Sequence, residues 1–178
     1  MWLPGKCCRE KFPMNNGSIW VRIDNRLVHG QVIETWIPYA QARMLVVAND
    51  ALADDGLQQE IIKLAIPKGV GVVFTSVDRV VQVFSDLEIN YSPSRLFFLF
   101  YCCPDACRAY NIGLHFTTVN IGNLHYGPGK LQICEHVALD EQDRECLYLL
   151  ESSGVRLDFR CVPHKQANLK SDWRVVTW

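Results

Sequence analysis

The residues best suited to carry out a reaction lie in one short segment, Arg22-Ile23-Asp24-Asn25-Arg26-Leu27-Val28-His29-Gly30-Gln31. A neutral imidazole nitrogen is a competent nucleophile near neutral pH, because histidine has an ordinary pKa of about 6.5. A phosphoryl group accepted by His29 would bring up to about two negative charges. Arg22 and Arg26 can neutralise these charges, since the planar guanidinium matches phosphate oxygens. The residue types therefore indicate phosphoryl-transfer chemistry centred on His29.

Two further residues of this segment support the same interpretation. Asp24 is able to orient an arginine or the imidazole, although it could equally brace the loop. Gly30 lets the backbone approach a bound anion closely, and free amides at the start of the next helix would favour an anion there. Simpler explanations exist as well, because most loop histidines are merely solvated and most Arg–Asp pairs after a strand are ordinary ion pairs. The residue types alone leave the catalytic and the structural interpretations open.

Strands alternate with helices in the pattern predicted for the whole chain. Apolar runs rich in β-branched residues predict strands at 19–23, 44–48, 70–74, 96–101, 116–121 and 155–161. The first four begin about 25 residues apart, which is the size of a strand with its crossover helix. Several runs are almost wholly apolar, as is typical of parallel strands buried on both faces. We predict an α/β fold with an open, mainly parallel sheet of about six or seven strands and helices on both faces.

Helices are predicted between these strands from apolar stripes and capping residues. Pro38 must kink or end the first of them, and Asp140 can cap the last. The Gly- and Pro-rich stretch 122–132 is predicted to be a loop. Ligands of open parallel sheets bind outside the carboxyl ends of the strands, so the segment around His29 has a suitable position for a functional site. The predicted helices cover 31–41, 57–65, 77–84 (with Ser76 as N-cap), 104–113 and 140–151.

Composition excludes several classes of function. The chain has 178 residues, of which 49% are apolar and 21% are charged, and its formal net charge is -1. This balance gives no electrostatic footprint for nucleic acid, and the longest apolar run is too short to cross a bilayer. The first residues lack the apolar core of a signal peptide, so a cytoplasmic protein is expected. We expect an N-terminal extension over residues 1–17 and a single domain over residues 18–178.

The chain contains 8 cysteines but no CxxC pair, so the spacing of a zinc ribbon is absent. Cys102, Cys103 and Cys107 lie close enough in the sequence to bind a metal. Free cysteines more often pack as small hydrophobic residues, and a reducing cytosol would keep them as thiols. No metal site is therefore expected.

The run RIDNRLVHGQV resembles the phosphorylation-site signature of the IIB proteins of the mannose, fructose and sorbose phosphotransferase family, R-[IV]-D-x-R-[LI]-[IV]-H-G-Q-V. Residues 45–55 resemble the second strand and following turn of that family. Residues 119–125 resemble its NVGG or NVGN loop, and Gly129-Lys130 and the helix start at Asp140 also fit. The similarity covers about residues 19–162.

This resemblance implies roles for individual residues. His29 would be the phosphoryl acceptor, usually through its Nδ1 nitrogen, and Arg26 would steady the phosphoryl group. Asp24 matches the acid of the signature. The family fold, an open and mainly parallel α/β sheet with helices on both faces, agrees with the fold predicted from periodicity. The further residues implied to contact phosphate or substrate, or to lie near the site, are Arg22, Gly30, Gln31, Asn120 and Gly122.

The resemblance also implies a reaction cycle and partners. A phosphohistidine IIA protein would donate to His29, which would pass the phosphoryl group to a sugar held by membrane IIC and IID proteins. The chain would thus be a protein-phosphohistidine–sugar phosphotransferase of the cytoplasm, associated with the inner face of the membrane through its partners. No nucleotide, cofactor or metal is required by this mechanism. The sequence names neither the sugar nor whether the chain forms a homo-oligomer.

Three alternatives remain beside this interpretation. A regulatory module of the same fold would be phosphorylated at the same residue without coupling to transport. A histidine phosphatase places Arg immediately before His-Gly, whereas Arg26 lies three residues upstream of His29. A nucleotide-binding α/β domain lacks support, since neither a Walker loop nor a GxGxxG motif is present. The chain also departs from the family at His125 and Tyr126, which could add polar contacts near the site or simply cover the loop.

Overall fold

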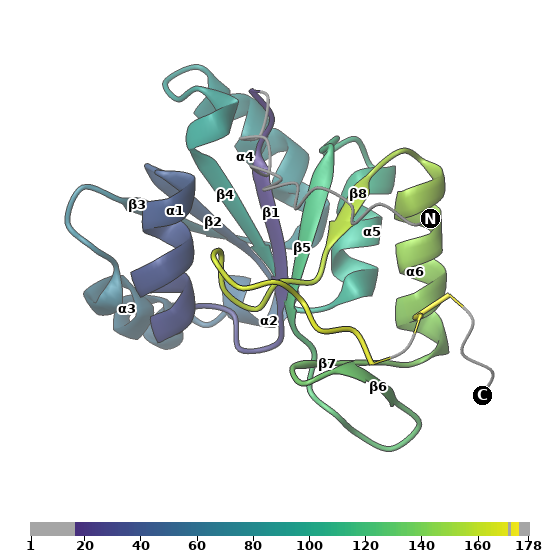
Figure 1. Cartoon of the computed structure of the whole chain (residues 1–178). Helices are drawn as coiled ribbons and strands as arrows, with labels where there is room; N and C mark the ends of the chain where they lie inside the picture. Colours follow the sequence, from purple (N-terminus) through teal and green to yellow (C-terminus); the bar gives the residue numbers. More distant parts are fainter. Residues whose placement is uncertain (1–16, 171, 175–178) are drawn as a thin grey trace, which may run out of the picture.

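A parallel β-sheet forms the centre of the computed structural model, which describes residues 17–170 and 172–174. The sheet has six strands in the order β3-β2-β4-β1-β5-β8, and every neighbouring pair is parallel (Figure 1). The predicted α/β fold with a mainly parallel sheet is confirmed. Its strands are β1 (Trp20–Asp24), β2 (Met44–Ala48), β3 (Gly71–Thr75), β4 (Leu96–Phe100), β5 (Thr118–Asn123) and β8 (Arg156–Asp158).

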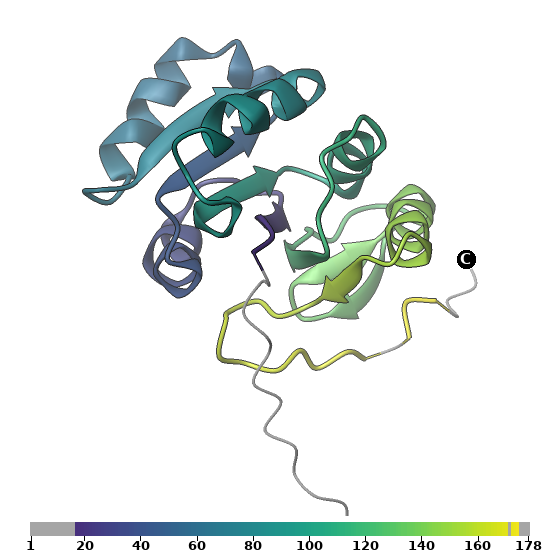
Figure 2. The same cartoon turned by 90° about the horizontal axis from the view of Figure 1, so that it is seen from above.

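Helical segments cover both faces of this sheet, as predicted. The π-helical turn η1 and helix α1 lie on one face, and α4, α5 and α6 lie on the other (Figures 1 and 2). Residues 1–16 of the predicted N-terminal extension lie outside the described residues. The helical segments are η1 (Val32–Trp36), α1 (Ile37–Ala40), α2 (Asp50–Ala53), α3 (Gly56–Ala65), η2 (Val77–Arg79), α4 (Val80–Glu88), η3 (Pro93–Arg95), α5 (Cys103–Asn111) and α6 (Glu141–Ser152).

The core consists of two apolar layers, one on each face of the sheet. Successive side chains of a strand point to opposite faces, so Phe98 of β4 packs in the layer of α4–α6 and Phe97 packs in the layer of α1. In β1, Val21 and Ile23 belong to the first layer. Arg22 lies between them and therefore points into the α1 layer, a position where a parallel strand would ordinarily carry an apolar residue.

The helix ends follow the capping residues of the sequence. Asp140 caps α6 in a capping box, in which the Asp143 amide donates to Asp140 Oδ1 at 2.8 Å. Gly154 follows this helix with φ +87°, in the left-handed region that favours glycine. Ser76 precedes the short η2 turn, but its side chain makes no capping hydrogen bond.

Of the two outcomes predicted for Pro38, an end or a kink of its helix, the end is wrong. The chain remains helical through Ala40, and Gln41 ends the segment with φ +50°. The hydrogen-bonding register changes from π in η1 to α in α1 immediately before the proline. The missing amide of Pro38 falls in the first turn of α1, where a proline is tolerated.

The predicted loop 122–132 is wrong at both of its ends. Strand β5 continues through Gly122 to Asn123, and residues beyond the loop form an antiparallel pair, β6 (Leu131–Cys134) and β7 (Val137–Leu139). Glycine in the sequence suggested a turn, but Gly122 lies inside a strand. A glycine is needed there because the guanidinium of Arg22 packs against its Cα.

Helix α3 forms where its apolar stripe predicts a helix, but this stripe does not face the sheet. Leu57 is 74% exposed and Leu64 is 88% exposed, and α3 contains no buried residue. Hydrophobic periodicity thus predicted the helix correctly, whereas its orientation depends on contacts that periodicity does not reveal.

The chain that follows β8 crosses the sheet on the same side as α1 (Figures 1 and 2). This part of the chain contacts η1, because the indole Nε1–H of Trp36 donates to the Cys161 carbonyl at 3.0 Å. It also contacts α1, because the ring centroids of Tyr39 and His164 lie 5.4 Å apart. The α1 layer is therefore closed by a segment that lies far from β1 in the sequence.

Candidate active site

The loop after β1 folds back on itself so that His29 lies beside the last residue of the strand. The amide of Leu27 donates to the carbonyl of Asp24 at 2.9 Å and closes a turn. Leu27 has φ +49°, a left-handed conformation that non-glycine residues adopt rarely and that often marks functional sites. His29 then leads into the helix, where its carbonyl accepts from the Ile33 amide at 3.1 Å.

The imidazole of His29 contacts Asp24 through one nitrogen only. His29 Nε2 lies 3.0 Å from Asp24 Oδ2. An ionised carboxylate only accepts hydrogen bonds, so Nε2 carries the proton in this pair. Within residues 17–170 and 172–174, His29 Nδ1 has no hydrogen-bond partner, and the side chain is 17% exposed. The lone pair of Nδ1 is consequently available at the surface.

Asp24 is fully buried and is held by three side chains. Arg22 Nη2 donates to Oδ2 at 2.7 Å, and Arg26 Nε donates to Oδ1 at 3.2 Å, in addition to the bond from His29. Burial raises the pKa of Asp24, but the hydrogen bond from His29 and the charge of Arg22, with the bonds from Arg26, outweigh burial. The pKa of Asp24 therefore lies well below its ordinary value, and the carboxylate is ionised.

Arg22 does not reach the surface, contrary to its predicted contact with phosphate. Its side chain has no exposed area, and its guanidinium donates to Asp24 and to Asn120 Oδ1. The guanidinium carbon lies 4.8 Å from the ring centroid of Trp36, in a cation–π arrangement. Arg22 thus lies beneath Asp24 and away from any incoming group, which favours a role in positioning Asp24.

Asn120 and Gly122 of β5 form the cradle of this buried arginine. Asn120 pairs in register with Arg22 on the neighbouring strand. Ile23 pairs with Ile121 in the same register. The register shifts before Asp24, which pairs with Asn123, and Gly122 is left as the extra residue of a β-bulge. A Cβ atom added at Gly122 would overlap the guanidinium carbon of Arg22.

Arg26, Gln31 and Gly30 form the rim of the site. Arg26 is 37% exposed, and its Nη2 donates to Gln31 Oε1 at 3.1 Å. Gly30 is exposed, and a Cβ added there would meet no atom within 4 Å. The predicted residues therefore divide into a surface set of His29, Arg26, Gln31 and Gly30, and a buried set of Asp24, Arg22, Asn120 and Gly122.

Asn25 joins three loops at this edge of the sheet. Its Nδ2 donates to the Tyr101 carbonyl at 3.0 Å, and its Oδ1 accepts from the His125 amide at 2.6 Å. The side chain of His125 is exposed and takes no part in this clamp, which uses only its backbone. The sequence interpretation assigned no role to Asn25, although an amide side chain in a tight loop is a common bridge between backbone groups.

Three residues without a predicted role also belong to the surroundings of this site: Trp36, Asp158 and Arg160. The ring of Trp36 stacks on Arg22. Asp158 and Arg160 form a buried ion pair next to Asn120. The available signal was that both charged residues lie within a predicted strand, since a buried strand seldom carries charged residues unpaired.

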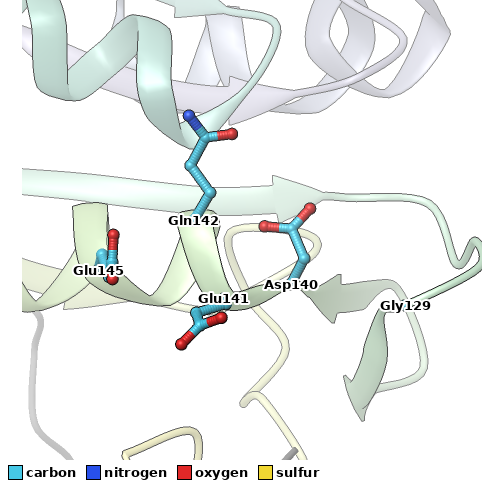
Figure 3. Close-up of a pocket in the computed structure, with 5 residues that line it drawn as sticks. All are labelled: Gly129, Asp140, Glu141, Gln142 and Glu145. Carbon is cyan, nitrogen blue, oxygen red and sulfur yellow. The ribbon is translucent and has the colours of Figure 1, made fainter.

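An open pocket of about 550 Å³ shares no residue with this site (Figure 3). It is lined by Gly129 and by the start of α6, with Asp140, Glu141 and Glu145 around it. These carboxylates would repel a phosphoryl group. Among the described residues there is no group of three or more His, Cys, Asp or Glu side chains that could hold a metal ion. In the same part of the chain, every helix is too short or too polar to span a bilayer.

Comparison with known families decides the relationship of this chain. The family model of the PTS system sorbose subfamily IIB component matches residues 19–174. The chain belongs to this family. The resemblance inferred from the signature around His29 is thus confirmed.

Relatives and a solved structure agree with the assignment to the IIB family. The sorbose-specific EIIB component of Klebsiella pneumoniae is 34% identical over 141 residues, which are 79% of this chain and 85% of the relative. The N-acetylgalactosamine-specific phosphotransferase enzyme IIB component 1 of Escherichia coli K12 is 35% identical over 147 residues, 82% of this chain and 90% of the relative. The crystal structure of the IIBSor domain of the K. pneumoniae sorbose permease superposes with a TM-score of 0.77 at 32% identity, covering 85% of this chain and 92% of that one.

Substitution by alanine should destabilise this IIB chain at Gly122 but not at Gly30. In Gly122→Ala the new methyl overlaps Arg22, which is buried and bonded at both ends and so cannot move freely. We expect the free energy of unfolding to fall by about 1–3 kcal/mol. Gly30→Ala, where the space is open, should change it by less than about 0.5 kcal/mol. Urea denaturation of both variants measures the difference, and equal losses would contradict this account of Gly122.

Asp24→Asn should lower stability and reduce its dependence on acid. The amide cannot neutralise Arg22, and removal of one partner from a buried pair costs about 3–5 kcal/mol. Because the folded pKa of Asp24 is depressed, its stabilising contribution is complete above the unfolded pKa of about 3.9 and is lost as the pH falls through the folded value. The variant should therefore lose less stability than the wild type below about pH 4.

Urea denaturation between about pH 3 and 7 would measure this slope. Asp54→Asn, which changes an exposed acid after α2, is the matched control and should retain the wild-type slope. An unchanged slope in Asp24→Asn would show that Asp24 does not titrate as described.

Proposed function

We propose that this chain is a phosphoryl carrier of a mannose-type sugar phosphotransferase system and that His29 Nδ1 accepts the phosphoryl group. The observation that carries the proposal is the pairing of His29 Nε2 with Asp24, which leaves Nδ1 as the nitrogen with a free lone pair. Membership of the IIB family supports the reaction class. The relatives are named for two different sugars, sorbose and N-acetylgalactosamine, so the proposal names sugars as the class of acceptor and does not specify which sugar is used.

The first step is transfer from a phosphohistidine of a IIA protein. The lone pair of His29 Nδ1 attacks phosphorus while the nitrogen–phosphorus bond of the donor breaks, and the donor imidazole retains that electron pair. Since Nε2 keeps its proton, the phosphorylated ring carries a positive charge. The ionised Asp24 carboxylate, 3.0 Å from Nε2, stabilises this charge without contacting the phosphoryl group.

The second step delivers the phosphoryl group to a sugar held by membrane IIC and IID proteins. A sugar hydroxyl attacks phosphorus and gives up its proton to solvent, while the bond to Nδ1 breaks and its electron pair returns to the ring, which becomes neutral. The cationic ring is a good leaving group, so the same Asp24–His29 pair serves acceptance and release. His29 lies at the surface of a loop, where it is open to two different partners in turn.

Arg26 is the cationic side chain proposed to contact the transferred group. Its guanidinium is partly exposed and is aimed by Asp24 and Gln31, which leaves it at the rim beside His29. Phosphoryl transfer depends mainly on positioning and charge stabilisation, both of which a fixed guanidinium supplies. Arg22, Asn120 and Gly122 act below it by fixing Asp24.

The assignment of the acceptor is tested by His29→Ala. Incubation with a phosphorylated IIA protein should add one phosphoryl group to the wild type and none to the variant. The measurement is the mass of the intact protein under neutral conditions that preserve phosphohistidine. His125→Ala, which removes an exposed histidine at the same sheet edge, is the control and should be labelled fully. Full labelling of His29→Ala would refute the assignment, and rapid release of free phosphate from the wild type would instead indicate a hydrolase.

Arg26→Ala should retain the nucleophile but slow its reaction. We expect the single-turnover rate of transfer from the donor to fall on the order of 10²-fold, since one preorganised charge contact is lost. Rapid-quench kinetics at saturating donor give this rate. Arg43→Ala removes an exposed arginine immediately before β2, at the amino-terminal ends of the strands and so away from His29. It should leave the rate unchanged. A wild-type rate in Arg26→Ala would remove Arg26 from the mechanism.

A further inference from the structure

Residues 158–161, here called the crossing segment, contact Asn120 of the buried set. They also contact Trp36 and Gln31, which lie more than a hundred residues earlier in the sequence. Asp158 is the last residue of β8 and pairs in register with Asn120, which itself pairs with Arg22. Three polar residues therefore follow one another across β1, β5 and β8. In a parallel sheet with two covered faces, the polar atoms of such a row need hydrogen-bond partners. Among the described residues, Arg22 Nε is one buried atom that has none.

The crossing segment fixes the orientation of the Asn120 amide. Asn120 Nδ2 donates to the carbonyl of Asp158 at 3.0 Å and to the carbonyl of Arg160 at 2.9 Å. Both hydrogens of the amide are thereby used on one side, and Oδ1 must face the other side, where it accepts from Arg22. A reversed amide would point its N–H groups at the guanidinium, and donor would oppose donor.

Arg160 gives the crossing segment the shape that brings these two carbonyls together. Its Nε donates to Asp158 Oδ1 at 2.9 Å, its Nη2 donates to Asp158 Oδ2 at 2.8 Å, and its Nη1 donates to the Pro163 carbonyl at 2.6 Å. The Arg160 amide also donates to Asp158 Oδ1 at 3.0 Å. This fork ties the segment into a turn, and only 8% of Arg160 is exposed.

Two further contacts join the crossing segment to the helix that follows His29. The carbonyl of Cys161 accepts from Trp36 Nε1 at 3.0 Å, and the Trp36 ring packs on Arg22. The Cys161 thiol donates to Gln31 Oε1 at 3.5 Å, the same oxygen that accepts from Arg26. The segment therefore supports Arg22 from two directions and reaches the rim through Gln31.

We propose that Arg160 is a positioning residue for phosphoryl transfer, which acts through Asn120 and Arg22 to hold Asp24 against His29 Nε2. The inference rests on the proposed function of His29. Arg160 contacts neither His29 nor the rim side chain of Arg26, so it does not bind the phosphoryl group. Its effect is to keep the proton of His29 on Nε2 and the lone pair on Nδ1.

The test compares Arg160→Met, which removes the guanidinium fork and keeps an unbranched stem, with Arg156→Met. Arg156 is an exposed arginine whose Nη2 donates to Thr118 Oγ1, and it lies on β8, the strand that leads into the crossing segment, so it is a matched control. One readout is the pair of ring-nitrogen NMR shifts of His29, measured without any donor. The other is single-turnover transfer from phosphorylated IIA protein at varied donor concentration.

Arg160→Met should shift the His29 nitrogens from the Nε2–H tautomer towards a mixture. It should also slow transfer at saturating donor by about ten- to hundredfold, because small displacements of a reacting group cost that much. The donor concentration for half-maximal rate should not change, since Arg160 is buried away from the donor. Arg156→Met should alter neither readout. Wild-type nitrogen shifts and a wild-type rate in folded Arg160→Met would overturn the proposal, as would equal losses in Arg156→Met.

If circular dichroism shows Arg160→Met to be unfolded, Arg160→Lys provides a milder test of the same residue. It keeps the positive charge but lacks the guanidinium fork that binds both oxygens of Asp158. The tautomer shift and the slower transfer should appear in the same direction but to a smaller extent, and wild-type values would overturn the proposal. A wild type that accepts no phosphoryl group would refute the proposed function, whereas the NMR readout would still report on positioning.

Discussion

A carboxylate without any exposed surface, that of Asp24, is the group on which the rest of the site depends. An unpaired buried charge would be too costly to maintain, so this carboxylate needs donors on every side that water cannot reach. Arg22 supplies one from below, and His29 supplies one from the loop. Arg26 supplies three, two from its guanidinium and one from its backbone amide. The left-handed conformation of Leu27 turns the chain back so that His29 can meet the carboxylate.

Arg22, the buried partner of Asp24, needs hydrogen-bond and charge partners of its own inside the sheet. Arg22 lies within a central strand, between β4 and β5, and points into an apolar layer. Its charge is met by Asp24, its second terminal nitrogen by Asn120, and its face by the ring of Trp36. Space for it exists only because Gly122 has no side chain. A surface histidine is thus oriented by a polar network that extends through three strands to the Asp158–Arg160 pair.

The sequence predicted the elements of this fold better than it predicted the contacts of the site. Strand β2 was placed correctly because its residues are uniformly apolar, and α6 because Asp140 marks its start. Side-chain periodicity defines an element but not what covers each face, so the exposed stripe of α3 was not foreseen. The same limit explains Arg22, whose burial follows from Gly122 and Trp36, residues that no local pattern connects to it. His29, Asp24 and Arg26 could be named together because a local loop contains all three.

The division of the charges suits a carrier that must release what it accepts. Arg22 and Arg26 exceed Asp24 by a single positive charge. A dianionic phosphoryl group on a cationic His29 ring adds a net charge of about -1 and would cancel that excess. If both guanidinium groups bound the phosphoryl group directly, they would stabilise the phosphorylated state and slow the second transfer. Burial directs the charge of Arg22 to Asp24 instead, where it supports the imidazole before and after transfer. In the proposed mechanism, Arg26 is the guanidinium that meets the phosphoryl group, because its side chain is partly exposed at the rim.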